Sequence, residues 1–126
     1  MKLDAIGIVA KNVTKSIQFY RLLGLNFPEL KEGEDHVEAQ TESGIRLMID
    51  SEELVKKLNS NWVSPVGQRT TLAFLCASPQ EVDSTYKKII ESGHKGHKEP
   101  WDAFWGQRYA SVMDPDGNSV DLFAPL

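Results

Sequence analysis

The chain has 126 residues, of which 40% are hydrophobic and 25% charged, as is usual for one globular domain. A formal net charge of −4 without a dense Lys/Arg run argues against binding to nucleic acid. No stretch approaches the ~20 apolar residues of a membrane span, and Cys76 is the only cysteine, which excludes a disulfide framework. The first residues lack the apolar run of a signal peptide, so we expect a cytoplasmic location.

The first half of the chain predicts strands around one main helix. Alternating side chains predict a strand over residues 3–10, and Asn12 is expected to cap a helix that stops at Gly24. Alternation then predicts two further strands and a short helix, over residues 35–40, 45–50 and 51–58.

The second half repeats this order. Alternation predicts a strand over residues 71–76, and Ser78-Pro79 is a strong helix start, with Gly93 as the stop. Residues 94–105 are expected to be irregular. A hairpin then follows, with Asp-Pro-Asp-Gly-Asn at 114–118 as its turn, because these residues supply the φ values and side-chain hydrogen bonds that tight turns need.

Two copies of a βαβββ unit account for this pattern, one over about 1–58 and one over about 70–126, within a single domain of residues 1–126. In each strand the side facing the helix is aliphatic, whereas the other side carries small and polar residues. Such a face does not fill a second core. It predicts an α+β fold in which a curved mixed sheet surrounds a cleft for a small molecule.

Several segments resemble the vicinal oxygen chelate superfamily, which holds glyoxalase I, fosfomycin- and bleomycin-resistance proteins and extradiol dioxygenases. They are Leu3-Asp4-Ala5-Ile6-Gly7-Ile8-Val9, Ser16-Ile17-Gln18-Phe19-Tyr20 with Leu23-Gly24-Leu25, and above all Asp114-Pro115-Asp116-Gly117-Asn118 with Val120-Asp121-Leu122. The resemblance covers essentially the whole chain and implies two βαβββ modules that form a glyoxalase-like half-barrel, and it implies a homodimer.

The metal enzymes of that superfamily carry one His, Gln or Glu on each of four strands. Carried over to this chain, those positions fall at Ala5, Met48, Thr71 and Asp121. Only Asp121 could bind a metal, whereas a catalytic divalent ion needs about three protein ligands. We therefore expect no metal or other cofactor, unless Asp121 belongs to a non-standard site with recruited ligands such as His36 and Glu38.

Candidate ligand-binding residues lie on the polar sides of the strands and in the aromatic segment before the last hairpin. They are His36, Gln40, Arg46, Trp101, Phe104, Trp105, Gln107, Arg108, Tyr109 and Asp121. Each has a structural alternative. His36 could be a half-exposed strand histidine, the aromatic residues could pack under a loop or at a dimer interface, and Arg108 could pair with Asp116 or Glu99. Asp121 could bind the neighbouring turn, Arg46 or Arg108.

Three functions are compatible with these residues. We favour a metal-independent protein of the glyoxalase/bleomycin-resistance type that encloses a small, aromatic molecule in the cleft, with no partner among nucleic acids or membranes. The alternative is a metal-dependent lyase, isomerase or dioxygenase. A protein that only binds other proteins would have its cleft filled by side chains. No catalytic residue is assigned.

Overall fold

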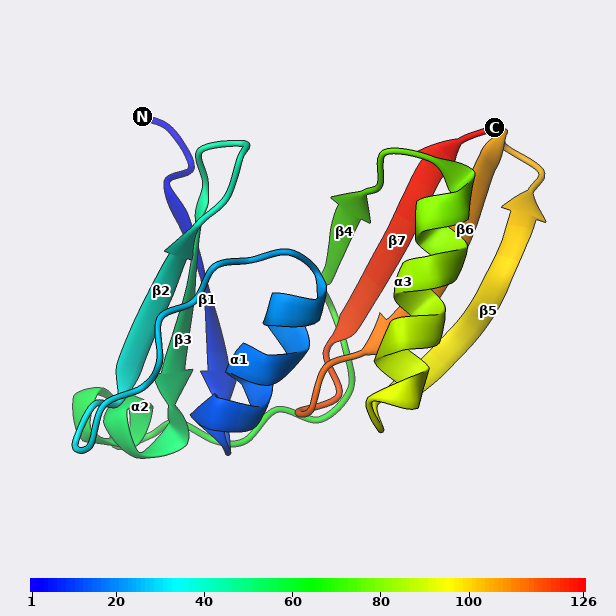
Figure 1. Cartoon of the computed structure of the whole chain (residues 1–126). Helices are drawn as coiled ribbons and strands as arrows, with labels where there is room; N and C mark the ends of the chain where they lie inside the picture. The colour runs from blue at the N-terminus through cyan, green and yellow to red at the C-terminus, as the bar shows by residue number, and fades with distance from the viewer. The chain divides into compact units, whose positions relative to one another are not determined.

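The computed structural model describes residues 1–126, which form two compact units, Met1–Val66 and Gly67–Leu126. Each unit has its own sheet with a helix packed on one face (Figure 1). No helix combines the length and apolar character that a membrane span requires.

The first unit contains a three-stranded sheet in the order β1-β3-β2, in which β1 runs parallel and β2 antiparallel to β3. Its elements are β1 (Ala5–Ala10), α1 (Val13–Leu22), β2 (His36–Gln40), β3 (Arg46–Ser51) and α2 (Glu52–Leu58). The predicted cap is confirmed, since Asn12 Oδ1 accepts a hydrogen bond from the Lys15 amide. Ile17 and Tyr20 of α1 are buried, as is Ile49 of β3, so they share the core of this unit.

The second unit contains a four-stranded sheet in the order β4-β7-β6-β5, in which only β4 and β7 are parallel. Its elements are β4 (Thr71–Leu75), α3 (Pro79–Glu91), β5 (Lys95–Ala103), β6 (Gln107–Met113) and β7 (Ser119–Pro125). Ser78 Oγ caps α3 through the Glu81 amide, as the sequence predicts. The core joins Val82 and Ile89 of α3 to the buried face of the sheet.

The predicted hairpin turn between β6 and β7 is confirmed, and Asp114 organises it. Asp114 is 4% exposed, and its carboxylate accepts hydrogen bonds from the amides of Asp116 and Asn118 and from the Asn118 side chain. Gly117 has a φ of +84°, a conformation that costs glycine little because it has no Cβ. The two strands are therefore held in register by a satisfied, rigid turn.

The expectation of irregular structure over residues 94–105 is wrong, because most of this segment forms β5. The strand escapes sequence analysis because residues 95–99 are all exposed and show no alternation, and because its pairing with β6 has two register shifts, on either side of Lys98. At Gly96 a Cβ atom would overlap the Tyr86 hydroxyl, so any larger residue there would force the Tyr86 side chain to move where β5 approaches α3.

The α+β class and the glyoxalase-like fold are confirmed, and the strands form two mixed sheets, one in each unit. The second unit has the full βαβββ order, whereas the first has only two strands after its helix. Residues 26–35 form no strand in the first unit; they include Pro28, which lacks an amide donor, and several charged side chains.

Candidate functional site

The face of the second sheet that points away from α3 carries most of the sequence-predicted residues. Along β6, Ala110 and Val112 are fully buried on the α3 side, whereas Tyr109 and Ser111 alternate with them on the opposite side. We call that opposite side the open face of the second unit. On β4, Thr71, Ala73 and Leu75 are exposed on it, and Leu75 is 68% exposed.

Five aromatic side chains form a connected group on this unit, which we call the aromatic row: Trp101, Phe104, Trp105, Tyr109 and Phe123. Trp105 is its centre, with ring centroids 4.9 Å from Phe104, 5.4 Å from Trp101 and 5.3 Å from Tyr109. Tyr109 stacks in turn on Phe123 at 6.1 Å, because the two residues are paired across β6 and β7. The structure thus brings together the aromatic residues that the sequence singles out and adds Phe123.

The hairpin between β5 and β6 presents the outer part of the row to solvent. Phe104 is 91% exposed and Trp105 is 48% exposed, so both rings present apolar surface that nothing in this unit covers. The Trp105 indole donates a hydrogen bond to Gln107 Oε1 at 2.8 Å, which fixes the orientation of the ring. Gln107 therefore positions the row through its contact with Trp105.

Asp121 lies next to the row on β7 and binds two hydroxyl groups. The Tyr109 hydroxyl donates to Asp121 Oδ2 at 2.7 Å, and the Ser111 hydroxyl donates to Oδ1 at 2.6 Å. Of the partners considered from sequence, neither the turn nor Arg108 binds it. Arg108 pairs with Asp83 and Asp102 instead. Burial and the Asp121 carboxylate raise the pKa of Tyr109 to about 12, so its hydroxyl remains a donor at neutral pH.

Arg108 lies on the α3 side of β6 and is separated from the aromatic row by the sheet. Its guanidinium donates to Asp83 of α3 at 2.8 Å and to Asp102 of β5 at 3.0 Å, instead of to Asp116 or Glu99. These two ion pairs connect α3 to the edge strand β5 through Arg108. Arg108 therefore stabilises the unit in this structure and does not join the other candidates.

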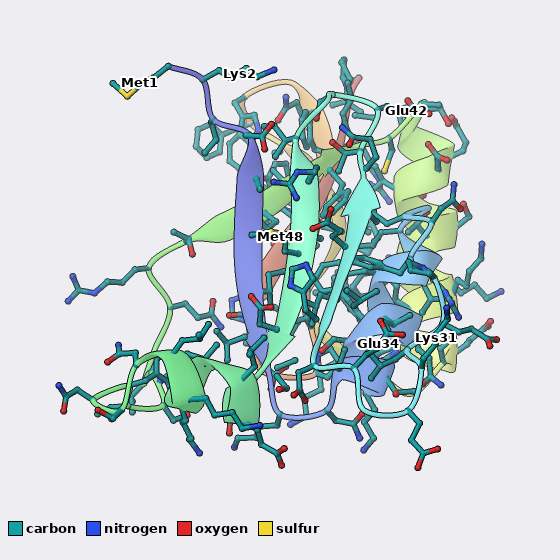
Figure 2. The ribbon with its side chains drawn as sticks, turned by 90° about the vertical axis from the view of Figure 1, so that its left-hand side faces the viewer. Met1, Lys2, Lys31, Glu34, Glu42 and Met48 are labelled. Carbon is teal, nitrogen blue, oxygen red and sulfur yellow. The ribbon has the colours of Figure 1, made fainter.

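The first unit also has an open face, and Figure 2 shows Met48 on it, on β3 between β1 and β2. A chain of charges crosses this face. His36 Nδ1 lies 2.5 Å from Asp50 Oδ1 and Nε2 lies 3.0 Å from Glu38 Oε2, so the ring donates to both carboxylates when it is protonated. The Arg46 guanidinium donates from Nη1 to Glu38 and from Nη2 to Asp4, both at 2.8 Å. We call these residues the charged chain.

Hydrogen bonds within the charged chain shift the pKa values of His36 and Glu38. The pKa of His36 is raised mainly by its hydrogen bond to Asp50 and to a lesser extent by the one to Glu38. The pKa of Glu38 is lowered mainly by the hydrogen bond from His36 and to a lesser extent by the one from Arg46. Gln40, the remaining candidate of this unit, donates to the Gly44 carbonyl at 2.9 Å and closes its own hairpin turn.

The residues present do not fit the divalent metal that the four strand positions imply. Ala5 and Thr71 replace two ligands, and Met48 is too soft a donor for a hard cation. The two nitrogens of His36 are directed at different carboxylates, so His36, Glu38 and Asp50 do not converge on one point. No group of three or more His, Cys, Asp or Glu side chains in the structure is arranged to hold a metal ion.

Two further features lie apart from these faces. Burial raises the pKa of the half-buried Cys76 thiol, which disfavours the reactive thiolate. A cavity of about 410 Å³ in the first unit contains none of the predicted site residues. It is lined by the start of α1, the start of α2 and the segment before β2: Lys11, Asn12, Val13, Thr14, Leu30, Glu34, Asp35, Ser51, Glu52, Glu53 and Lys56.

Comparisons with known proteins identify one family for this chain. The family model of the Glyoxalase/Bleomycin resistance protein/Dioxygenase superfamily matches residues 2–122. The uncharacterized protein YraH of Bacillus subtilis (strain 168) is 30% identical over 129 residues, which span 100% of both chains.

Two solved structures illustrate the similarity of fold. A glyoxalase/bleomycin resistance protein/dioxygenase family enzyme from Burkholderia phytofirmans PsJN has a TM-score of 0.87 at 17% identity, with 100% of both chains covered. A glyoxalase-related enzyme from Fulvimarina pelagi has a TM-score of 0.83 at 17% identity, with 98% of this chain and 87% of that one covered. At these identities the likeness concerns the fold alone.

Proposed function

Because the chain belongs to the Glyoxalase/Bleomycin resistance protein/Dioxygenase superfamily, as its sequence motifs predict, we propose that it binds a planar aromatic small molecule without a metal ion. The observation that carries this proposal is the aromatic row beside Asp121 on the open face of the second unit. Binding there would cover rings that are otherwise in contact with water.

The chemistry of the row favours a ring-shaped ligand. Aromatic pairs contribute about 0.5–1.5 kcal/mol beyond the burial of apolar area, and sites for small molecules combine apolar walls with a few fixed polar groups. Trp105 and Tyr109 supply such walls, while Asp121, held by two hydroxyl donors, supplies a fixed acceptor. A planar molecule with one polar edge matches this combination.

The residue types at the four strand positions support binding without a metal. Chelation of a substrate by a divalent ion needs about three protein ligands, and Ala5, Thr71 and Met48 do not supply them. We therefore attribute affinity to stacking and hydrogen bonding on the protein itself.

Isothermal titration with quinoline, indole and 2-naphthol as probes tests this function. At least one probe is expected to bind, and Trp105→Ala is expected to weaken that binding about tenfold, which corresponds to about 1.4 kcal/mol. Trp62→Ala is the matched control, because Trp62 lies in the first unit and is not part of the aromatic row. Its ring centroid is 5.8 Å from Lys56 Nζ. Equal loss in both variants, or no binding of any probe, would contradict the proposal.

Metal analysis tests the second part of the proposal. Protein purified without a chelator is expected to contain less than a tenth of an equivalent of Ni, Zn, Mn or Fe, as an order-of-magnitude threshold, and to bind the probe equally well after dialysis against EDTA. Stoichiometric metal, or binding that only added metal restores, would instead support a metal-dependent lyase, isomerase or dioxygenase.

A further inference from the structure

We propose that the ligand of the aromatic row carries a positive charge, as in a quaternised nitrogen heterocycle or an aryl-alkylammonium ion, and that Asp121 is its counter-ion. This inference rests on the proposed function and adds the charge class of the ligand. Three features of the second unit support it.

The first feature is the connection between the row and the carboxylate. Tyr109 belongs to both: its ring contacts Trp105 and Phe123, with centroids 5.3 and 6.1 Å away, and its hydroxyl donates to Asp121 at 2.7 Å. A ligand ring that stacks on the row beside Tyr109 therefore lies close to the Asp121 carboxylate, which the Tyr109 hydroxyl contacts. Aromatic faces carry a negative quadrupole, so both groups favour a cation in the same place.

The second feature is the kind of partner that Asp121 has. Asp121 accepts hydrogen bonds from the neutral hydroxyls of Tyr109 and Ser111, and no Lys, Arg or His of the second unit forms an ion pair with it. Hydroxyl donors orient the carboxylate but leave its negative charge uncompensated. β7 lies between β4 and β6 in the sheet, so the charge is fixed on an interior strand.

The third feature is an ammonium group that already lies on the row. Lys98 Nζ is 5.2 Å from the centroid of the Trp101 ring, within the range of a cation–π contact. The row thus accommodates a cation supplied by the protein itself. Lys98 lies on the edge strand β5 and is exposed, so its flexible side chain can leave when a ligand arrives.

The opposite reading, that Lys98 recruits an anion, fits the structure less well. Lys98 lies between the two register shifts of β5 and is exposed, whereas Asp121 is held at both oxygens. Preorganised charges contribute more to recognition than mobile ones, because less order is imposed on binding. An anion would also meet the uncompensated charge of Asp121.

Three bicyclic probes of nearly equal size separate these cases: 1-methylquinolinium, which is a cation, quinoline, which is neutral at pH 7.5, and 2-naphthoate, which is an anion. In titrations at low salt, 1-methylquinolinium is expected to bind about fivefold or more tightly than quinoline. Asp121→Asn is expected to lower that ratio to the smaller preference that the aromatic faces alone provide, while changing the affinity for quinoline less than about twofold.

Matched variants show whether the preference depends on this carboxylate. Asp102→Asn removes the same charge from the α3 side of the sheet, where Asp102 pairs with Arg108, and is expected to keep the ratio. Lys98→Met removes the resident cation and is expected to raise the ratio. Lys98→Met also tests the inference if Asp121→Asn does not fold. A ratio of affinities that is unchanged or lower in Lys98→Met would contradict the inference.

The outcomes distinguish this inference from the function on which it rests. Binding of all three probes with equal affinity, or tightest binding of 2-naphthoate, would overturn the cation preference and leave aromatic binding intact. The same holds if Asp121→Asn keeps the wild-type ratio. Failure of every probe to bind would overturn both.

Discussion

Tyr109→Phe tests the contact that joins the aromatic row to Asp121, because it removes one hydroxyl and keeps the ring. In the wild type that hydroxyl donates to Asp121 Oδ2 at 2.7 Å, and the ring contacts Trp105 and Phe123. A hydrogen bond to a charged group contributes about 1.5–3 kcal/mol in net terms, and a neutral one about 1 kcal/mol. Since this contact is only part-buried, we expect Tyr109→Phe to cost about 1–1.5 kcal/mol of unfolding free energy.

A double-mutant cycle separates this hydrogen bond from other effects of the substitution. Asparagine at position 121 presents a neutral acceptor, and a hydrogen bond to it is about half as strong as one to a carboxylate. Tyr109→Phe should therefore cost about 0.5 kcal/mol in an Asp121→Asn background. Ser111→Ala, which removes the donor to Oδ1, serves as the neighbouring comparison and is expected to cost about as much as Tyr109→Phe.

Urea unfolding followed by circular dichroism at pH 7 measures these free energies, provided that the denaturant slope stays constant among the variants. The reasoning is refuted if Tyr109→Phe unfolds within about 0.3 kcal/mol of the wild type, or if its cost is the same with asparagine at position 121. Either result would mean that the Tyr109 hydroxyl does not hold the Asp121 carboxylate.

Three further predictions concern the framework around the sites. The carboxylates beside His36 raise its pKa, so its stabilising charge is fully present below its ordinary value near 6.5 and is lost as the pH rises through the raised value. His36→Gln should therefore destabilise more at pH 5.5 than at pH 9 in urea unfolding, and a pH-independent loss would contradict this. Gly96→Ala should cost about 1–3 kcal/mol through overlap with the Tyr86 hydroxyl, and less when combined with Tyr86→Phe; equal costs in both backgrounds would exclude that overlap. Leu122→Ala, at a side chain 1% exposed, should cost about 2–4 kcal/mol, whereas Leu75→Ala, 68% exposed on the open face, should cost under about 0.5 kcal/mol; similar melting temperatures for the two would show that the faces are assigned wrongly.

Features that depend on neighbouring residues could be predicted from the sequence. The caps Asn12 and Ser78 and the turn around Asp114 form as expected, because side chain and amide partners lie within a few residues. The faces of β7 follow equally well from alternation, which places Val120 in the core and Asp121 on the opposite side.

Features that depend on strand register were harder to predict. Asp121 pairs with Ser111 across β6 and β7, and Tyr109 lies two pairs further along on the same face. Neither partner can therefore be identified without the strand pairing. β5 lacks alternation and shifts register twice, which leaves no local signal of a strand. Arg108 is different, because alternation along β6 already places it on the opposite side from Tyr109, and that parity was available in the sequence.

The position of Asp121 connects the family resemblance to the proposed chemistry. It is the one carboxylate among four strand positions that serve a metal in related enzymes, and the other three are Ala5, Met48 and Thr71. In the metal-free protein that we propose, donors must orient this carboxylate without pairing it with a cationic side chain. Tyr109 and Ser111 meet that need, and Tyr109 also places the charge beside an aromatic surface. A position suited to chelation in a relative can thus recognise an organic cation here, because a carboxylate attracts an ammonium or pyridinium-type ion by charge alone, without the strict coordination geometry of a divalent metal.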